Sequence, residues 1–88
     1  MKFLVICSPK DGSPMDRFAE LVPEEAEDLR RLESEGILID AWSPGGPGAV
    51  LIIEAISASD AEGVITTLPL TVAGLIDFEL TPLHDLGI

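Results

Sequence analysis

The chain has 88 residues and a formal net charge of −11, from sixteen Asp and Glu against five Lys and Arg. Nucleic acids and anionic membrane surfaces are bound through basic patches, so this charge excludes both as partners. A hydrophobic fraction of 47% is too high for a disordered acidic segment, and the length suits one domain over residues 1–88. The single cysteine excludes an internal disulfide and predicts a cytoplasmic protein.

The first half of the chain predicts a strand, a long helix and a second strand. Residues 2–8 form the strand, and a loop with Pro and Gly follows it. A helix is predicted over about residues 16–35, because Phe18, Val22, Leu29 and Leu32 recur on one helical face. Gly36 ends that helix, and residues 37–42 form the next strand.

The second half predicts two strands and a shorter helix. A Gly-rich hairpin connection leads into a strand over residues 49–56. Ser57 or Ser59 caps a helix over about residues 60–68, which Pro69 ends. Residues 76–83 form the last strand, in which apolar and polar side chains alternate as at a sheet edge.

This order of elements, β-α-β-β-α-β, predicts an α+β ferredoxin-like fold with a four-stranded antiparallel sheet and two helices on one face. Right-handed crossovers place the first and third strands in the centre. Residues 3–7 and 49–53 are apolar at every position, so both faces of the central strands need a cover. Two helices cover one face, and we expect a second copy of the chain to cover the other, giving a homodimer or larger homo-oligomer.

Glu25 is the sharpest candidate for a catalytic residue, because it interrupts the apolar helix face formed by Phe18, Val22, Leu29 and Leu32. Burial raises the pKa of a carboxyl group, so Glu25 could take a proton next to a carbonyl and return it elsewhere on the same molecule. The alternative is a carboxylate that reaches water at the helix edge among Glu20, Glu24, Glu27 and Asp28.

The second strand contains two further candidates. Alternation places Trp42 on the same strand face as Leu38 and Asp40. Trp42 could wall a pocket and stack on a planar ligand, or pack in a core or dimer interface. Asp40 could be a second acid, or an exposed carboxylate of an edge strand. The adjacent His84 and Asp85 are left open as site residues, and no spacing of His and Cys predicts a metal site.

Several stretches resemble the muconolactone isomerase family of the dimeric α/β-barrel superfamily. They are Leu68-Pro69-Leu70, the segment Asp77-Phe78-Glu79-Leu80-Thr81, and Gly36 after a long acidic helix with Trp42 six residues on. The resemblance covers nearly the whole chain and implies the fold predicted above, without a cofactor. It also implies a functional Glu25, because the family has a Glu at the matching distance before a Leu and a Gly, here Leu32 and Gly36.

The chain departs from this family where an anionic substrate would be held. Muconolactone-processing members have basic or imidazole side chains on the first strand and around the Trp of the second. This chain has Leu4, Ile6, Asp40 and Ser43 there. The resemblance therefore implies a neutral or apolar substrate, with Leu4 and Ile6 as substrate-binding residues.

Three functions follow as hypotheses. The first is a cofactor-free isomerase that shifts a double bond in a small neutral or apolar carbonyl or lactone compound, with Glu25 as acid and base in a pocket walled by Trp42. The second is a cofactor-independent monooxygenase or polyketide cyclase on the same scaffold. The third is a non-catalytic module that binds a small molecule or assembles with itself.

Overall fold

The computed structural model describes all 88 residues and contains one four-stranded sheet and three helices. The strands lie in the order β2-β3-β1-β4, and every neighbouring pair is antiparallel. The elements in chain order are β1 (Lys2–Pro9), α1 (Met15–Ser34), β2 (Leu38–Trp42), β3 (Ala49–Glu54), α2 (Ala58–Ile65), α3 (Pro69–Val72) and β4 (Ile76–Leu83). The predicted ferredoxin-like order and the central placement of β1 and β3 are confirmed.

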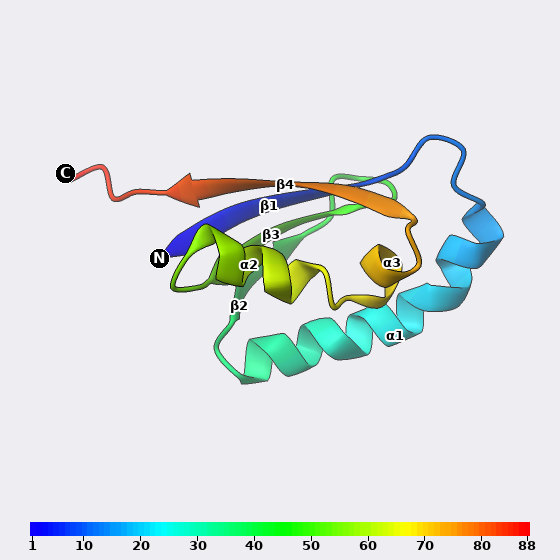
Figure 1. Cartoon of the computed structure of the whole chain (residues 1–88), viewed down its shortest axis with the longest axis horizontal. Helices are drawn as coiled ribbons and strands as arrows, with labels where there is room; N and C mark the ends of the chain where they lie inside the picture. Colours follow the sequence, from blue (N-terminus) through cyan, green and yellow to red (C-terminus); the bar gives the residue numbers. More distant parts are fainter.

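All three helices lie on the same side of the sheet (Figure 1). The chain ends after β4 in a short tail that extends beyond the sheet, on the side where β1 begins. None of the helices is long and apolar enough to span a lipid bilayer. Because all three helices lie on one side, the sheet has one covered face and one face, called the open face below, that no helix covers.

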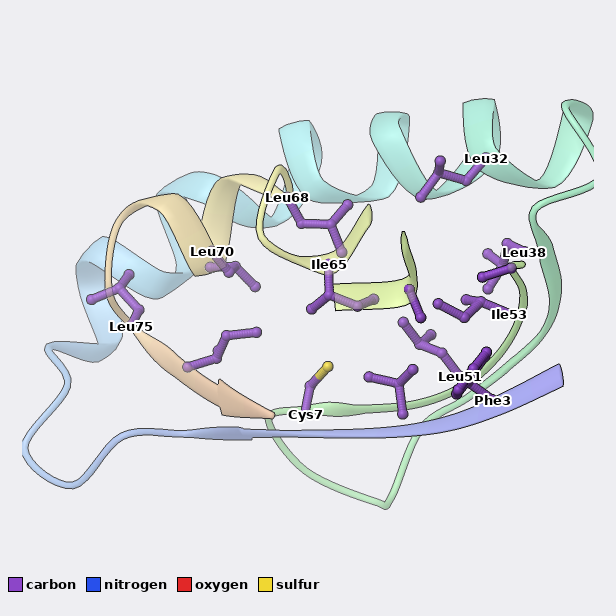
Figure 2. Packing of buried hydrophobic residues seen from close by; sticks show 14 of the residues in the cluster. Phe3, Cys7, Leu32, Leu38, Leu51, Ile53, Ile65, Leu68, Leu70 and Leu75 are labelled. Atoms are coloured by element: carbon purple, nitrogen blue, oxygen red, sulfur yellow. The ribbon is translucent and has the colours of Figure 1, made fainter. Parts of the chain in front are cut away.

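The core lies between the sheet and the helices. Every second residue of the central strands points into it, including Phe3, Val5 and Cys7 of β1 and Leu51 and Ile53 of β3, each at most 6% exposed. Figure 2 shows the side chains of Phe3, Cys7, Leu51 and Ile53 facing the segment that contains α2 and α3, from which Ile65, Leu68 and Leu70 come. Of the apolar stripe predicted for α1, Phe18 and Leu32 are buried, Leu29 is half-buried and Val22 is 47% exposed.

The segment after α2 differs from the prediction. The helix that the sequence places over residues 60–68 ends at Ile65, and Pro69 begins a separate short helix, α3, instead of ending one. The first helical position needs no hydrogen bond from its N–H and favours the fixed φ of proline, so Pro69 suits a helix start. Ser57, and not Ser59, caps α2, since its hydroxyl accepts a hydrogen bond from the Asp60 N–H at 3.1 Å.

A bulge in β2 also changes a predicted side-chain direction. Leu38 pairs with Ile53, but Asp40 pairs with Ile52, so Ile39 is an extra residue opposite the ladder. Leu38 is buried on the helix side, whereas Asp40 and Trp42 lie on the open face. Simple alternation had placed all three on one face, and this prediction was wrong because the extra residue shifts the strand by one position.

The open face is apolar along its two central strands. Leu4, Val50 and Ile52 are half-buried there, and Ile6 is 40% exposed. These four side chains are cross-strand neighbours, since Leu4 pairs with Ile52 and Ile6 pairs with Val50. Trp42 extends the patch across β2 and is 65% exposed. The helices cover none of this surface.

Candidate functional site

A cavity of about 170 Å³ lies between α1 and the covered face of the sheet. Eleven residues line it, and nine of them are hydrophobic. They come from five parts of the chain and are Cys7, Phe18, Val22, Glu25, Ala26, Leu29, Gly48, Ala49, Leu51, Leu70 and Ile76. Glu25 is the only acidic residue among them, and none of the five Lys and Arg residues lines the cavity.

The sequence pattern of α1 explains why a carboxylate faces this cavity. Glu25 lies on the helix face of Phe18 and Leu32, which are both buried against the sheet. Its side chain is half-buried, so the alternative of a fully solvated carboxylate at the helix edge does not describe it. The predicted inward position of Glu25 is therefore what the structure shows, whereas its catalytic role stays a prediction.

One hydrogen bond connects Glu25 to a distant part of the chain. Its Oε1 accepts from the main-chain N–H of Leu70, the second residue of α3, at 3.0 Å. Burial raises the pKa of the Glu25 carboxyl above its ordinary value, the Leu70 hydrogen bond lowers it in part, and the charge of Asp28 raises it. A carboxyl with a raised pKa is a better proton carrier near neutral pH than a solvated one.

Cys7 faces the same cavity from the opposite wall. Figure 2 shows its sulfur pointing from β1 toward the helices, on the side where Leu70 lies. The thiol is 6% exposed, and burial together with the nearby charge of Glu25 raises its pKa to about 11. A thiol with such a pKa is protonated and unreactive at neutral pH, as expected for a buried structural cysteine.

Gly48, at the end of the glycine-rich connection between β2 and β3, lines the cavity. Gly48 has a φ of +116°, and a Cβ at this position would lie 2.5 Å from the carbonyl oxygen of Cys7. The backbone can approach β1 this closely only because residue 48 has no side chain. The sequence marked this segment as a hairpin and gave no sign that Gly48 borders a site.

The other predicted site residues do not lie in this cavity. Leu4, Ile6, Asp40 and Trp42 are all on the open face, with the sheet between them and Glu25. A pocket that combines Glu25 with Asp40 and is walled by Trp42 does not exist within one chain. The β2 bulge and the alternation of β1 together produce this separation, because adjacent strand residues point to opposite faces.

The remaining candidates lie apart from both groups. His84 and Asp85 are exposed beyond the end of β4 and border a surface hollow with Lys2 and Leu83. No group of three His, Cys, Asp or Glu side chains has the arrangement of a metal site. Sequence reasoning missed Leu70, whose main-chain N–H contacts Glu25, because periodicity gives no information about a side chain that bonds to backbone 45 residues away.

Two solved structures share this fold over nearly the whole chain. Muconolactone isomerase matches with a TM-score of 0.78 and 24% sequence identity, over 99% of this chain and 92% of its own. The 5-chloro-2-hydroxyhydroquinone dehydrochlorinase TftG from Burkholderia phenoliruptrix AC1100, in complex with 2,5-dihydroxybenzoquinone, matches with a TM-score of 0.77 and 20% identity, over 96% and 94%. No protein-family model and no curated protein sequence matches the chain. The resemblance seen in the sequence is thus confirmed at the level of the fold.

Proposed function

We propose that the chain is a cofactor-free enzyme that moves a proton within a small neutral or apolar carbonyl or lactone compound and thereby shifts a double bond. The observation that carries this proposal is Glu25, a half-buried carboxyl with a raised pKa in an otherwise apolar cavity. Perturbed carboxyl groups in cavities are frequent acid–base catalysts. Both structural neighbours are named as enzymes that convert small molecules, which supports an enzymatic role.

The proposed reaction needs one group that first accepts and then donates a proton. Ionised Glu25 removes the proton next to the carbonyl, and the electron pair delocalises toward the carbonyl oxygen as a dienolate. Protonated Glu25 then returns the proton to a carbon farther along the conjugated system, so the double bond moves and the enzyme is restored. The apolar walls limit how much water can reach the carboxyl and compete for the proton.

The cavity favours neutral ligands. No cation lines it, and the chain has a net charge of −11, so an anionic ligand would meet repulsion from Glu25 without a compensating partner. We therefore expect the methyl ester of muconolactone to bind more tightly than free muconolactone in isothermal titration calorimetry. Tighter binding or faster turnover of the free acid would contradict this preference and indicate that Lys2, Arg17 or another cation reaches the site.

The size of the cavity favours the isomerase over the second hypothesis. An engineered protein cavity of about 150 Å³ holds one benzene molecule. A volume of about 170 Å³ suits a single-ring compound and is small for the fused rings handled by a polyketide cyclase or a related monooxygenase. The third hypothesis, a non-catalytic binding module, is favoured because no residue that lines the cavity has a polar side chain other than Glu25 and Cys7. It predicts ligand binding that survives loss of the Glu25 carboxylate.

We also propose a homo-oligomer built on a dimer in which two open faces pack together. The support is the apolar patch of Leu4, Ile6, Val50 and Ile52, which no helix covers. In this arrangement Leu4, Ile6, Asp40 and Trp42 lie between the two sheets. Any contribution of these four residues to substrate binding or catalysis would then occur at the dimer interface, and not beside Glu25 of the same chain.

Substitution Glu25→Gln tests the proposed reaction. The amide keeps the size of the side chain and an oxygen that accepts the Leu70 hydrogen bond, but it does not exchange protons. We expect isomerase activity on a single-ring unsaturated lactone ester to fall by roughly 10²–10⁴-fold, with an unchanged circular dichroism spectrum. Substitution Glu24→Gln, on the exposed side of the same helix, is the control and should keep full activity. Full activity of the Glu25 variant would contradict the proposal.

A further inference from the structure

The hydrogen bond between Leu70 and Glu25 joins two elements that are otherwise far apart in the sequence. Glu25 Oε1 lies 3.0 Å from the main-chain nitrogen of Leu70, and the two residues are separated by 45 positions. Glu25 makes no other hydrogen bond, so its second oxygen, Oε2, has no partner within the protein. The two oxygens of the carboxyl group are therefore in different environments.

The local structure of α3 explains why Leu70 offers a free N–H. The first N–H groups of a helix have no acceptor within the helix. Pro69 has no N–H, and the N–H groups of Val72 and Ala73 bond to the carbonyl oxygens of Leu68 and Pro69. Leu70 itself is only 7% exposed. Without Glu25, its N–H would be a buried donor with no protein partner, which is unfavourable.

The groups around Glu25 make this single donor important. Its own helix contributes the negative charge of Asp28, and β1 contributes the protonated thiol of Cys7. The lining residues from β3, α3 and β4, namely Ala49, Leu51, Leu70 and Ile76, have no titratable side chain. Leu70 N–H is thus the one group in the cavity that stabilises the ionised carboxylate by a hydrogen bond.

We propose that the main-chain N–H of Leu70 is the positioning group of the site: it holds Oε1 of Glu25 and leaves Oε2 as the oxygen that exchanges the proton with the ligand. This inference rests on the proposed function and deepens it. A carboxylate fixed at one oxygen keeps the other in a constant direction, which is a condition for rapid proton transfer. α3, which the sequence did not predict, then has the role of supplying this donor.

The first test uses the unmodified protein. In ¹H–¹⁵N correlation spectra recorded across a pH series, we expect the Leu70 amide proton to shift downfield with the same midpoint at which the Glu25 carboxyl carbon titrates. In the Glu25→Gln variant this shift should disappear. The Val72 amide, which bonds to Leu68 in the same turn, is the control and should not follow that midpoint. A Leu70 amide that ignores the titration of Glu25 would overturn the proposal.

The second test removes the donor and keeps the side chain. Replacing Leu70 by its α-hydroxy acid turns the amide into an ester, and the same change at Val72 is the matched control, since it also removes one hydrogen bond of α3. We expect the Leu70 ester to raise the pKa of Glu25 and to lower kcat by roughly tenfold or more with little change in KM. The Val72 ester should leave the pKa of Glu25 unchanged.

The outcomes separate this inference from the proposed function. If both esters leave the pKa of Glu25 unchanged, Leu70 does not position the carboxylate, even if Glu25→Gln is inactive. If the Leu70 ester shifts the pKa but Glu25→Gln remains fully active, the positioning contact exists and the acid–base role of Glu25 is wrong. Only a shifted pKa together with an inactive Gln variant supports both.

Discussion

At the scale of single residues, Glu25 connects the chemistry of the cavity to the stability of the fold. Its pKa is raised above the ordinary value of 4.5 in the folded chain, so the folded state binds the proton more tightly than the unfolded state. The contribution of Glu25 to stability is then complete below its ordinary pKa and is lost as the pH rises through the folded pKa. Ionised Glu25 at neutral pH therefore costs folding free energy.

A comparison of unfolding curves should reveal this cost. We expect urea denaturation of the wild type and of Glu25→Gln to give a difference in unfolding free energy that changes in favour of the variant as the pH rises from about 4 to about 8. The other carboxylates are common to both proteins, so the difference isolates Glu25. A difference that stays constant over this range would show that the carboxyl is not perturbed.

Gly48 allows a second prediction for a single residue. Substitution Gly48→Ala places a Cβ 2.5 Å from the Cys7 carbonyl oxygen and forces alanine into a positive φ, so we expect a loss of about 1–3 kcal/mol in unfolding free energy. Substitution Gly46→Ala, in the same connection but with no atom within 4 Å of the added Cβ, is the control. Equal stability of the two variants would contradict the close approach.

These residues also show what a sequence reveals about a site. Glu25 could be predicted to face inward because it interrupts a regular apolar stripe, and a stripe is a local pattern. The contact with Leu70 could not be predicted, since it depends on where α3 packs against α1. The positions of Asp40 and Trp42 relative to Glu25 also depended on a bulge that no residue in Leu38–Trp42 signals.

At the scale of elements, the cap of α2 decides where that helix begins. The Ser57 hydroxyl accepts from Asp60 N–H, and the Asp60 carboxylate accepts from Ile56 N–H at 3.2 Å. We expect Ser57→Ala to lower the free energy of unfolding by about 1 kcal/mol, and with it the melting temperature, because the Asp60 N–H loses this acceptor. Ser59→Ala, two residues later and inside α2, removes a hydroxyl that makes no hydrogen bond and should change stability little. The opposite order would return the cap to Ser59.

The strands and α1 could be predicted closely because their patterns are long, and β4 matches residues 76–83. The short α3 could not, because four residues that begin with proline contain no helical period. Proline was interpreted as the end of a helix when it begins one. A proline can end the helix before it or begin the helix after it, and the helix propensity of proline alone does not distinguish these two roles.

At the scale of the whole molecule, the open face predicts self-association. Substitution Ile6→Asp places a charge in the centre of the apolar patch, where Ile6 is 40% exposed. If two such faces pack together, we expect the dissociation constant of the dimer to rise by roughly a hundredfold or more, because an unpaired buried charge costs about 3 kcal/mol or more. Val72→Asp, on the helix side at 71% exposure, is the control. Sedimentation velocity at micromolar concentration measures both, and a monomeric wild type would contradict the dimer.

The apolar cavity beside Glu25 has a further consequence, for the volume of the protein. Space that side chains leave unfilled disappears when a chain unfolds, so hydrostatic pressure favours the unfolded state in proportion to such space. The cavity of about 170 Å³ is partly open to solvent, since its lining residue Val22 is 47% exposed, and the part of it that stays free of water should add to the pressure sensitivity of this small protein. A ligand that binds in the cavity stabilises the folded state, so a rise in the unfolding pressure offers a way to find the natural ligand without knowing the reaction.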